Sequence, residues 1–251
     1  MLSTAFPAAP AAIATPPAVA PPAPATPGTP TPCLPSNLPA IWPAMDDTLR
    51  RSPMLLAQLR RLQQAGWTVQ CNSGEGSQCF TNLKRIDLDL NGPIQRTLST
   101  LAHEIGHTGD TSFDPRLHAS AQDMLKATMD SEVNAICANL QARHEILANG
   151  GIDIGCSGAM YAYYIAAWQF YQRHGDLDRL KGHIGCMALW EANSRDGATY
   201  YQAYLNNFQK FHSLPLVPPV AAGFVVSRQT GAWQALQREM AGQPAMVSPA
   251  G

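Results

Sequence analysis

Residues 103 to 107 read His-Glu-Ile-Gly-His, and the spacing of these residues suits metal chemistry. On a helix, positions four apart lie one turn apart on the same face, so both imidazoles can reach a single ion. Zn²⁺ binds imidazole nitrogen at about 2.0–2.1 Å. Glu104 lies beside that face, where a carboxylate can take a proton from water instead of binding the metal. The pattern therefore predicts that His103 and His107 bind Zn²⁺ and that Glu104 is the general base of a hydrolase.

The context of the motif supports this interpretation over chance. In a chain of this composition the pattern arises at random in roughly one case in 200. Here a strand-like segment and the turn Asn91-Gly92-Pro93 precede it, and the motif lies near the end of an expected helix.

A catalytic zinc usually takes three protein ligands, so one more is needed. Metzincins would continue with glycine at 110 and histidine at 113, but this chain has Asp110 and Phe113, which excludes that class. Glu132 is the preferred third ligand, because it lies in a following helical segment that can pack antiparallel to the first. His118 and Asp114 remain the main alternatives. The other candidates are acidic residues and one histidine that follow the motif, namely Asp110, Asp123, Asp130 and His144.

The elements that must position these residues are mostly helical. Residues 67 to about 90 predict a small antiparallel sheet, whose last strand, 85–90, alternates polar and apolar residues as a half-buried strand does. Ser52 followed by Pro53 is typical of a helix start. Helical patterns are expected at about 53–66, 93–108, 115 or 120 to 147, 157–173, 177–192, 197–211 and 229–241, with a Pro-rich loop at 214–222.

The six cysteines indicate a possible disulfide framework. Cys71 and Cys79 flank a turn-rich loop between two short β-like runs, and facing positions at the base of a hairpin suit disulfide geometry. We therefore expect a bond between Cys71 and Cys79, which would favour an oxidising compartment. Reduced, half-buried thiols are the alternative.

The two ends of the chain differ from the middle in composition. The first 45 residues carry no charged side chain, and residues 1–32 hold ten Pro and ten Ala. Such a segment cannot bury a core, so residues 1–40 are expected to be a disordered tail and 243–251 a flexible one. Residues 41–242 then form a single domain.

Composition also narrows the function and the compartment. No Lys or Arg follows Met1 and prolines interrupt every apolar run, so no secretory signal is expected. No apolar run reaches 18 residues, which argues against a membrane span. A net charge of −1 argues against nucleic-acid binding.

Residues 94–145 resemble the gluzincin type of zinc metallopeptidase, in which HExxH is followed some tens of residues later by a helical glutamate. The resemblance implies His103, His107 and Glu132 as zinc ligands and Glu104 as general base. It also implies an α+β, predominantly helical, zincin-like fold, with a small antiparallel sheet, the HExxH helix and then a helical bundle. The thermolysin-like pattern has an Asp four residues after the ligand glutamate, whereas this chain has Ile136 there.

Amide hydrolysis needs a hydrogen-bond donor for the oxyanion besides the metal. The candidates are side chains of the helical segments after Glu132, and the sequence does not choose among them: Tyr161, Tyr163, Tyr164, Tyr200, Tyr201, Tyr204 and His183.

The lack of a signal, the Pro/Ala tail and the expected disulfide together resemble a delivered bacterial toxin, such as metallopeptidase effectors of the type VI secretion system. That resemblance implies a protein or peptide substrate, an immunity protein, a secretion-spike partner, and action in a target-cell periplasm. The alternatives are an intracellular, cytoplasmic regulatory peptidase and a non-catalytic binding module with a structural zinc.

Overall fold

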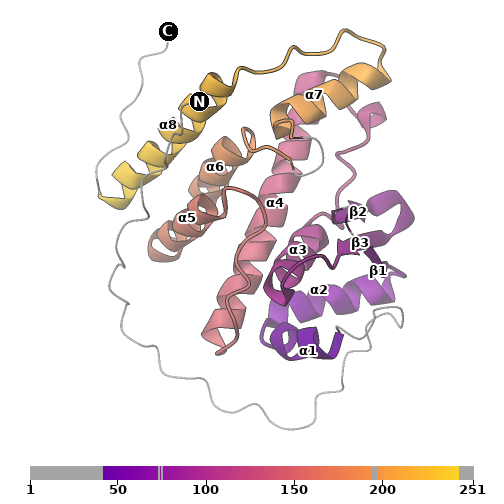
Figure 1. Ribbon diagram of the computed structural model, residues 1–251, viewed down its shortest axis with the longest axis vertical. Coiled ribbons are helices and arrows are strands. Elements are labelled where there is room, and N and C mark those ends of the chain that lie inside the picture. The colour runs from indigo at the N-terminus through magenta and orange to yellow at the C-terminus, as the bar shows by residue number, and fades with distance from the viewer. Residues whose placement is uncertain (1–41, 73, 75, 194–196, 243–251) are drawn as a thin grey trace. The chain divides into compact units, whose positions relative to one another are not determined.

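Figure 1 shows the computed structural model of the chain, which describes residues 42–242 except 73, 75 and 194–196. The expected tails at 1–40 and 243–251 lie outside the described residues, and so does Cys33. No helix in the described part of the chain is both long enough and apolar enough to cross a membrane.

The described residues are mostly helical with one small sheet, which confirms the predicted α+β, predominantly helical class. Ser52 caps the second helix by accepting a hydrogen bond from the Leu55 backbone, with Pro53 at the first helical position. Ser120 caps the longest helix in the same way. The helices are α1 (Trp42–Arg50), α2 (Pro53–Gln64), α3 (Ile94–Gly106), α4 (Ala121–Ala148), α5 (Tyr161–His174), α6 (Leu177–Ala188), α7 (Tyr200–Phe211) and α8 (Ala222–Met240).

The sheet is mixed, so the prediction of an antiparallel sheet is wrong. Its strands are β1 (Thr68–Asn72), β2 (Gln78–Phe80) and β3 (Arg85–Asp89), and their order is β1-β3-β2. Strand β3 runs parallel to β1 and antiparallel to β2. It takes the central place because Ile86 and Leu88 are fully buried, whereas β2 is short and more exposed.

This strand order also rules out the expected bond between Cys71 and Cys79. Cys71 pairs with Leu88 on one side of β3, and Cys79 pairs with Ile86 on the other side. Two strand spacings separate the cysteines by about 10 Å, which exceeds the reach of a disulfide. The described cysteines are all free thiols: Cys71, Cys79, Cys137, Cys156 and Cys186. The pairing of cysteines therefore gives no support for an oxidising compartment.

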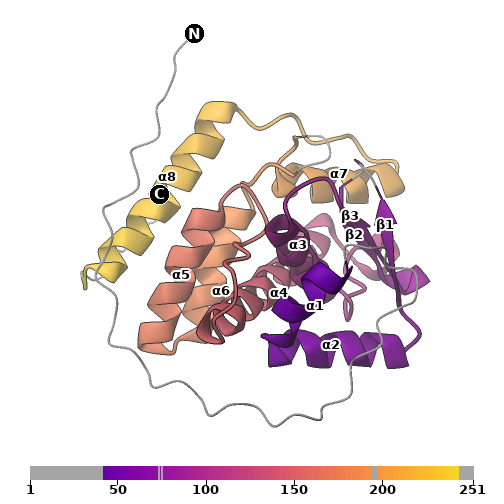
Figure 2. The same cartoon turned by 60° about the horizontal axis from the view of Figure 1, so that its bottom comes forward.

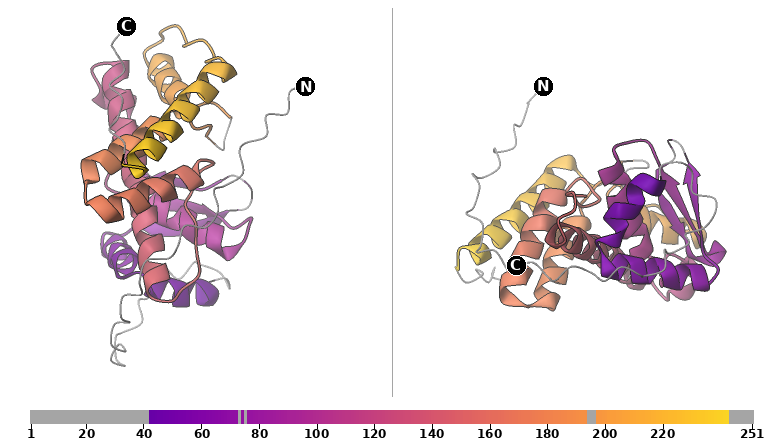
Figure 3. Two further views of the ribbon diagram at one scale, coloured as in Figure 1. Left: turned by 90° about the vertical axis from the view of Figure 1, so that its left-hand side faces the viewer. Right: turned by 90° about the horizontal axis from the view of Figure 1, so that it is seen from below.

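Helix α4 lies between two hydrophobic cores. Its C-terminal half contributes Ala142 and Ile146 to a core with α1, α2, α3 and the sheet. Its middle contributes Val133 and Leu140 to a second core with α5, α6 and α8. Both Figure 1 and Figure 2 show α4 with α3 on one side and the α5–α6 pair on the other. In the right-hand view of Figure 3, α5 and α6 lie between α8 and the sheet.

Helices α3 and α4 come closest at Gly106. A Cβ at this position would lie 2.5 Å from the Ala135 Cα atom and 3.1 Å from its Cβ. The obstacle is backbone, which cannot move aside as a flexible side chain can. Gly106 is therefore required by the packing of the two helices, despite the cost of glycine inside a helix.

We predict that Gly106→Ala lowers the free energy of unfolding by about 1–3 kcal/mol, because overpacking outweighs the gain in helix propensity. Gly182→Ala is the matched control, since a Cβ on this glycine of α6 meets nothing within 4 Å. It should stabilise the protein by up to about 1 kcal/mol. Urea unfolding of both variants measures the difference, and equal stabilisation by the two alanines would contradict the packing argument.

Candidate metal centre

Three side chains from α3 and α4 converge on one point. His103 lies in the last turn of α3, His107 is the C-cap residue one turn further on, and Glu132 reaches them from α4. The two histidine Nε2 atoms are 3.2 Å apart. The Glu132 Oε2 atom lies 3.5 Å from the His103 Nε2 atom and 3.7 Å from that of His107. All three residues are at most 8% exposed, so the structure brings together the set that the sequence favoured.

The geometry of this group fits a metal ion. Tetrahedral ligands at about 2.0–2.1 Å from zinc are about 3.4 Å from one another, close to the three distances observed here. The Glu132 Oε2 atom is also buried without a hydrogen-bond partner among the described residues. Such an oxygen is costly to bury unless something compensates it. A bound cation would supply that compensation, and a buried His₂Glu group can hold one, although this geometry does not fix which metal.

Neighbouring side chains orient two of the three groups. His107 Nδ1 is hydrogen-bonded to the Ser131 hydroxyl at 2.8 Å, which leaves Nε2 directed at Glu132. The second carboxylate oxygen of Glu132 accepts a hydrogen bond from the Tyr204 hydroxyl on α7. Partners of this kind fix the orientation of metal ligands. The Nδ1 atom of His103 has no such partner in the described part of the chain.

A buried polar contact sets the register of the two helices. The Ser99 hydroxyl donates to the Asn139 Oδ1 atom at 2.9 Å, and both residues are buried. Ser99 lies one turn before His103, and Asn139 lies two turns after Glu132, so the helices run antiparallel. The backbone N–H of Ser157 also donates to Asn139 Oδ1, which holds the segment before α5 against α4.

Glu104 lies beside the group and is also buried. Burial raises the pKa of Glu104 to about 7, against the opposing effect of His103. The Cys79 backbone N–H, on β2, donates to the Glu104 carboxylate. Burial lowers the pKa of His107 to about 4, which keeps its imidazole neutral. Burial would raise the pKa of Glu132 too, but His107 and His103 outweigh it and lower that pKa to about 2.

The pKa of Glu104 makes the metal-free protein less stable as pH rises. The folded value of about 7 exceeds the ordinary 4.5, so the folded state binds the extra proton between these values and loses stability as pH passes from 4.5 to 7. We predict that Glu104→Gln stabilises the metal-free protein at pH 8 by on the order of 1–3 kcal/mol and has little effect at pH 5. Chemical unfolding at the two pH values measures this, and an equal effect at both would contradict it.

The alternative third ligands are engaged elsewhere. His118 Nε2 lies 2.7 Å from the Ser112 carbonyl oxygen. Asp114 pairs with Arg116 and caps the short 3₁₀ helix Pro115–Leu117. Neither residue joins the group that contains Glu132.

Tyr163 and Tyr200, two of the candidates that the sequence left open, make different contacts. Tyr163 is buried in the second core and is hydrogen-bonded to His183, whose Nε2 atom is 2.8 Å from the Glu239 carboxylate on α8. Tyr200 instead stacks on Tyr204 with ring centroids 5.6 Å apart. The negative charge of Glu132 raises the pKa of Tyr200 well above its usual range.

The buried residue Glu191 links the start of α5 to the start of α7. The Glu191 side chain accepts hydrogen bonds from the Met160 backbone and from the Tyr164 hydroxyl, both at the start of α5. Its backbone carbonyl accepts a hydrogen bond from the Tyr200 N–H at 3.0 Å. Sequence reasoning did not single out Glu191, and its position in a loop between helices carries no pattern that would reveal it.

Comparison of the chain with models of protein families, with curated proteins and with solved structures finds no match.

Proposed function

We propose that this protein is a zinc-dependent peptidase that hydrolyses amide bonds. The observation that carries the proposal is the buried triangle of two imidazole nitrogens and one carboxylate oxygen, with a second buried carboxylate, Glu104, beside it. In this proposal His103, His107 and Glu132 hold the zinc. Two histidines and one carboxylate form a ligand set of catalytic rather than structural zinc sites.

When bound, zinc would acidify a water molecule and polarise the scissile carbonyl. Glu104 is the group that takes the proton from this water and later gives it to the leaving amine. Glu104 suits both steps by position, because its carboxylate is buried beside the three proposed ligands. Burial of Glu104 also keeps bulk water from competing for that proton.

Tyr200 is the residue we propose as the donor to the oxyanion. Its ring is held against Tyr204 and its backbone against Glu191, so it lies at the side of the group that α7 covers. The charges of Glu132, Glu191 and Glu104 all raise the pKa of Tyr200, so its hydroxyl keeps its proton. Tyr204 is excluded from this role because its hydroxyl already donates to Glu132.

Strand β2 supports a peptide as substrate. It pairs with β3 on one side only, and no described strand covers its other edge. The Cys79 N–H of β2 donates to Glu104, so this strand lies alongside the proposed site. An extended peptide can bind to such an edge through backbone hydrogen bonds.

We predict that Glu104→Ala abolishes peptide hydrolysis but keeps zinc, whereas Glu132→Ala loses zinc as well. His118→Ala is the matched control and should keep both, because His118 contacts a loop carbonyl instead of the group. Two measurements are needed. Mass spectrometry gives the zinc content, and the release of new amino termini from a library of internally quenched peptides gives the hydrolysis. Full hydrolysis by Glu104→Ala would defeat the catalytic proposal, and zinc retained by Glu132→Ala would defeat the ligand assignment.

Tyr200→Phe should lower kcat about 10²- to 10³-fold, as expected when an oxyanion donor is lost, with zinc content unchanged. Tyr161→Phe is its control, because Tyr161 is 54% exposed. Equal rates for the two phenylalanine variants would remove Tyr200 from the mechanism.

The role as a delivered toxin acting in a periplasm, with an immunity protein and a secretion-spike partner, stays a proposal that rests on the resemblance alone. The free thiols remove one of its arguments and are equally compatible with a cytoplasmic regulatory peptidase. A non-catalytic zinc module would retain zinc but show no hydrolysis even in the unaltered protein.

A further inference from the structure

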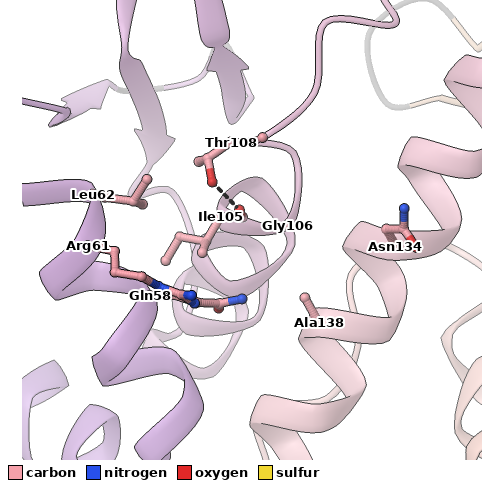
Figure 4. Close-up of a pocket in the computed structure, with 9 residues that line it drawn as sticks. Gln58, Arg61, Leu62, Ile105, Gly106, Thr108, Asn134 and Ala138 are labelled. Carbon is pink, nitrogen blue, oxygen red and sulfur yellow. Dashed lines mark hydrogen bonds between the residues drawn. The ribbon is translucent and has the colours of Figure 1, made fainter. Parts of the chain in front are cut away.

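A pocket of about 370 Å³ lies behind the motif helix, between α2 and α4. None of the three proposed metal ligands lines it, so it is separate from the metal centre. Figure 4 shows the Gln58 and Arg61 side chains entering from α2, Ile105, Gly106 and Thr108 at the end of α3, and Asn134 and Ala138 on α4.

Two polar groups of the pocket lack protein partners. The Gln58 Oε1 atom is buried and accepts no hydrogen bond from the described residues. Arg61 lies at the exposed side of the pocket and has no ion-pair partner in the part of the chain that the structure describes. A buried acceptor without a donor is costly, and a free guanidinium favours a carboxylate. The pocket therefore offers one acceptor and one cation to a ligand.

The rest of the lining is mixed, since Thr108 and Asn134 are polar and the other residues are apolar or glycine. Leu62, Ile105 and Ala138 supply hydrocarbon surface next to the two polar groups. Phosphate sites in proteins usually combine several cationic side chains or backbone N–H donors. This pocket has one guanidinium, so a singly charged carboxylate suits it better than a phosphate. The ligand must also carry an N–H for Gln58 and an apolar part.

We propose that this pocket binds the C-terminal residue of a peptide. The terminal carboxylate would pair with Arg61, the backbone N–H would donate to Gln58 Oε1, and the side chain would pack on Leu62 and Ile105. The volume is in the range of small-ligand sites. This inference does not depend on the proposed peptidase activity, because it uses no residue of the metal centre.

Isothermal titration calorimetry of the full, zinc-loaded chain with N-acetyl-alanyl-leucine tests the proposal. We expect saturable binding that weakens at least about tenfold in Arg61→Gln, as loss of a charge-assisted hydrogen bond implies. Arg60→Gln is the matched control, because Arg60 is exposed like Arg61 but does not line the pocket; its binding should stay within about twofold. The C-terminal amide of the same peptide should bind at least about tenfold more weakly.

Three results of the titrations would overturn the proposal, and a fourth comes from competition with phosphate. The three are no saturable binding up to about 10 mM, equal binding by Arg61→Gln and the unaltered chain, or equal binding of the acid and the amide. Displacement of the peptide by an equal concentration of inorganic phosphate would likewise reject a peptide terminus in favour of a general anion site. Circular dichroism of the two arginine variants confirms that each is folded.

Discussion

The contact between α3 and α4 at Gly106 and Ala135 determines where every group of the proposed metal centre lies. Because Gly106 has no Cβ, the two backbones come close enough for the Glu132 side chain to reach both histidines. The buried pair of Ser99 and Asn139 fixes how far one helix is shifted along the other. The first contact sets the distance between the helices and the second sets their shift along the axis. Together they bring the ligand atoms within 4.8 Å of one another.

The electrostatics of the centre couple folding to metal binding. Two carboxylates are buried close together, and their pKa values shift in opposite directions. The pKa of Glu132 is lowered because its carboxylate faces two imidazoles. The pKa of Glu104 is raised because burial removes most of its contact with water. Burying charge without a compensating partner is unfavourable. A bound cation would relieve that cost and stabilise the fold, as metal sites that form only in the folded state do. Helix α7 adds Tyr204, whose hydroxyl donates to the Glu132 carboxylate oxygen that does not face the histidines.

Much of the centre could be predicted from sequence because its information is local. Helical spacing alone places His103 and His107 on one face, and the pattern around Glu132 indicates a second helix that can pack antiparallel to the first. The sheet could not be predicted, since the alternation of β3 shows that one face is buried but does not name its partner strands. Because β3 lies between β1 and β2, Cys71 and Cys79 are not on neighbouring strands and cannot form the expected bond. Tyr200 and Tyr204 come from a distant helix and depend on tertiary packing.

X-ray absorption at the zinc edge of the zinc-loaded protein tests the central claim most directly. The account predicts about one zinc per chain, with only nitrogen and oxygen neighbours at about 2.0–2.1 Å and the outer-shell signal of two imidazoles. Free thiols are present in the chain, and Cys79 lies next to Glu104, so sulfur is a real competitor. A sulfur neighbour at about 2.3 Å, or a protein that binds no zinc, would contradict the assignment of His103, His107 and Glu132.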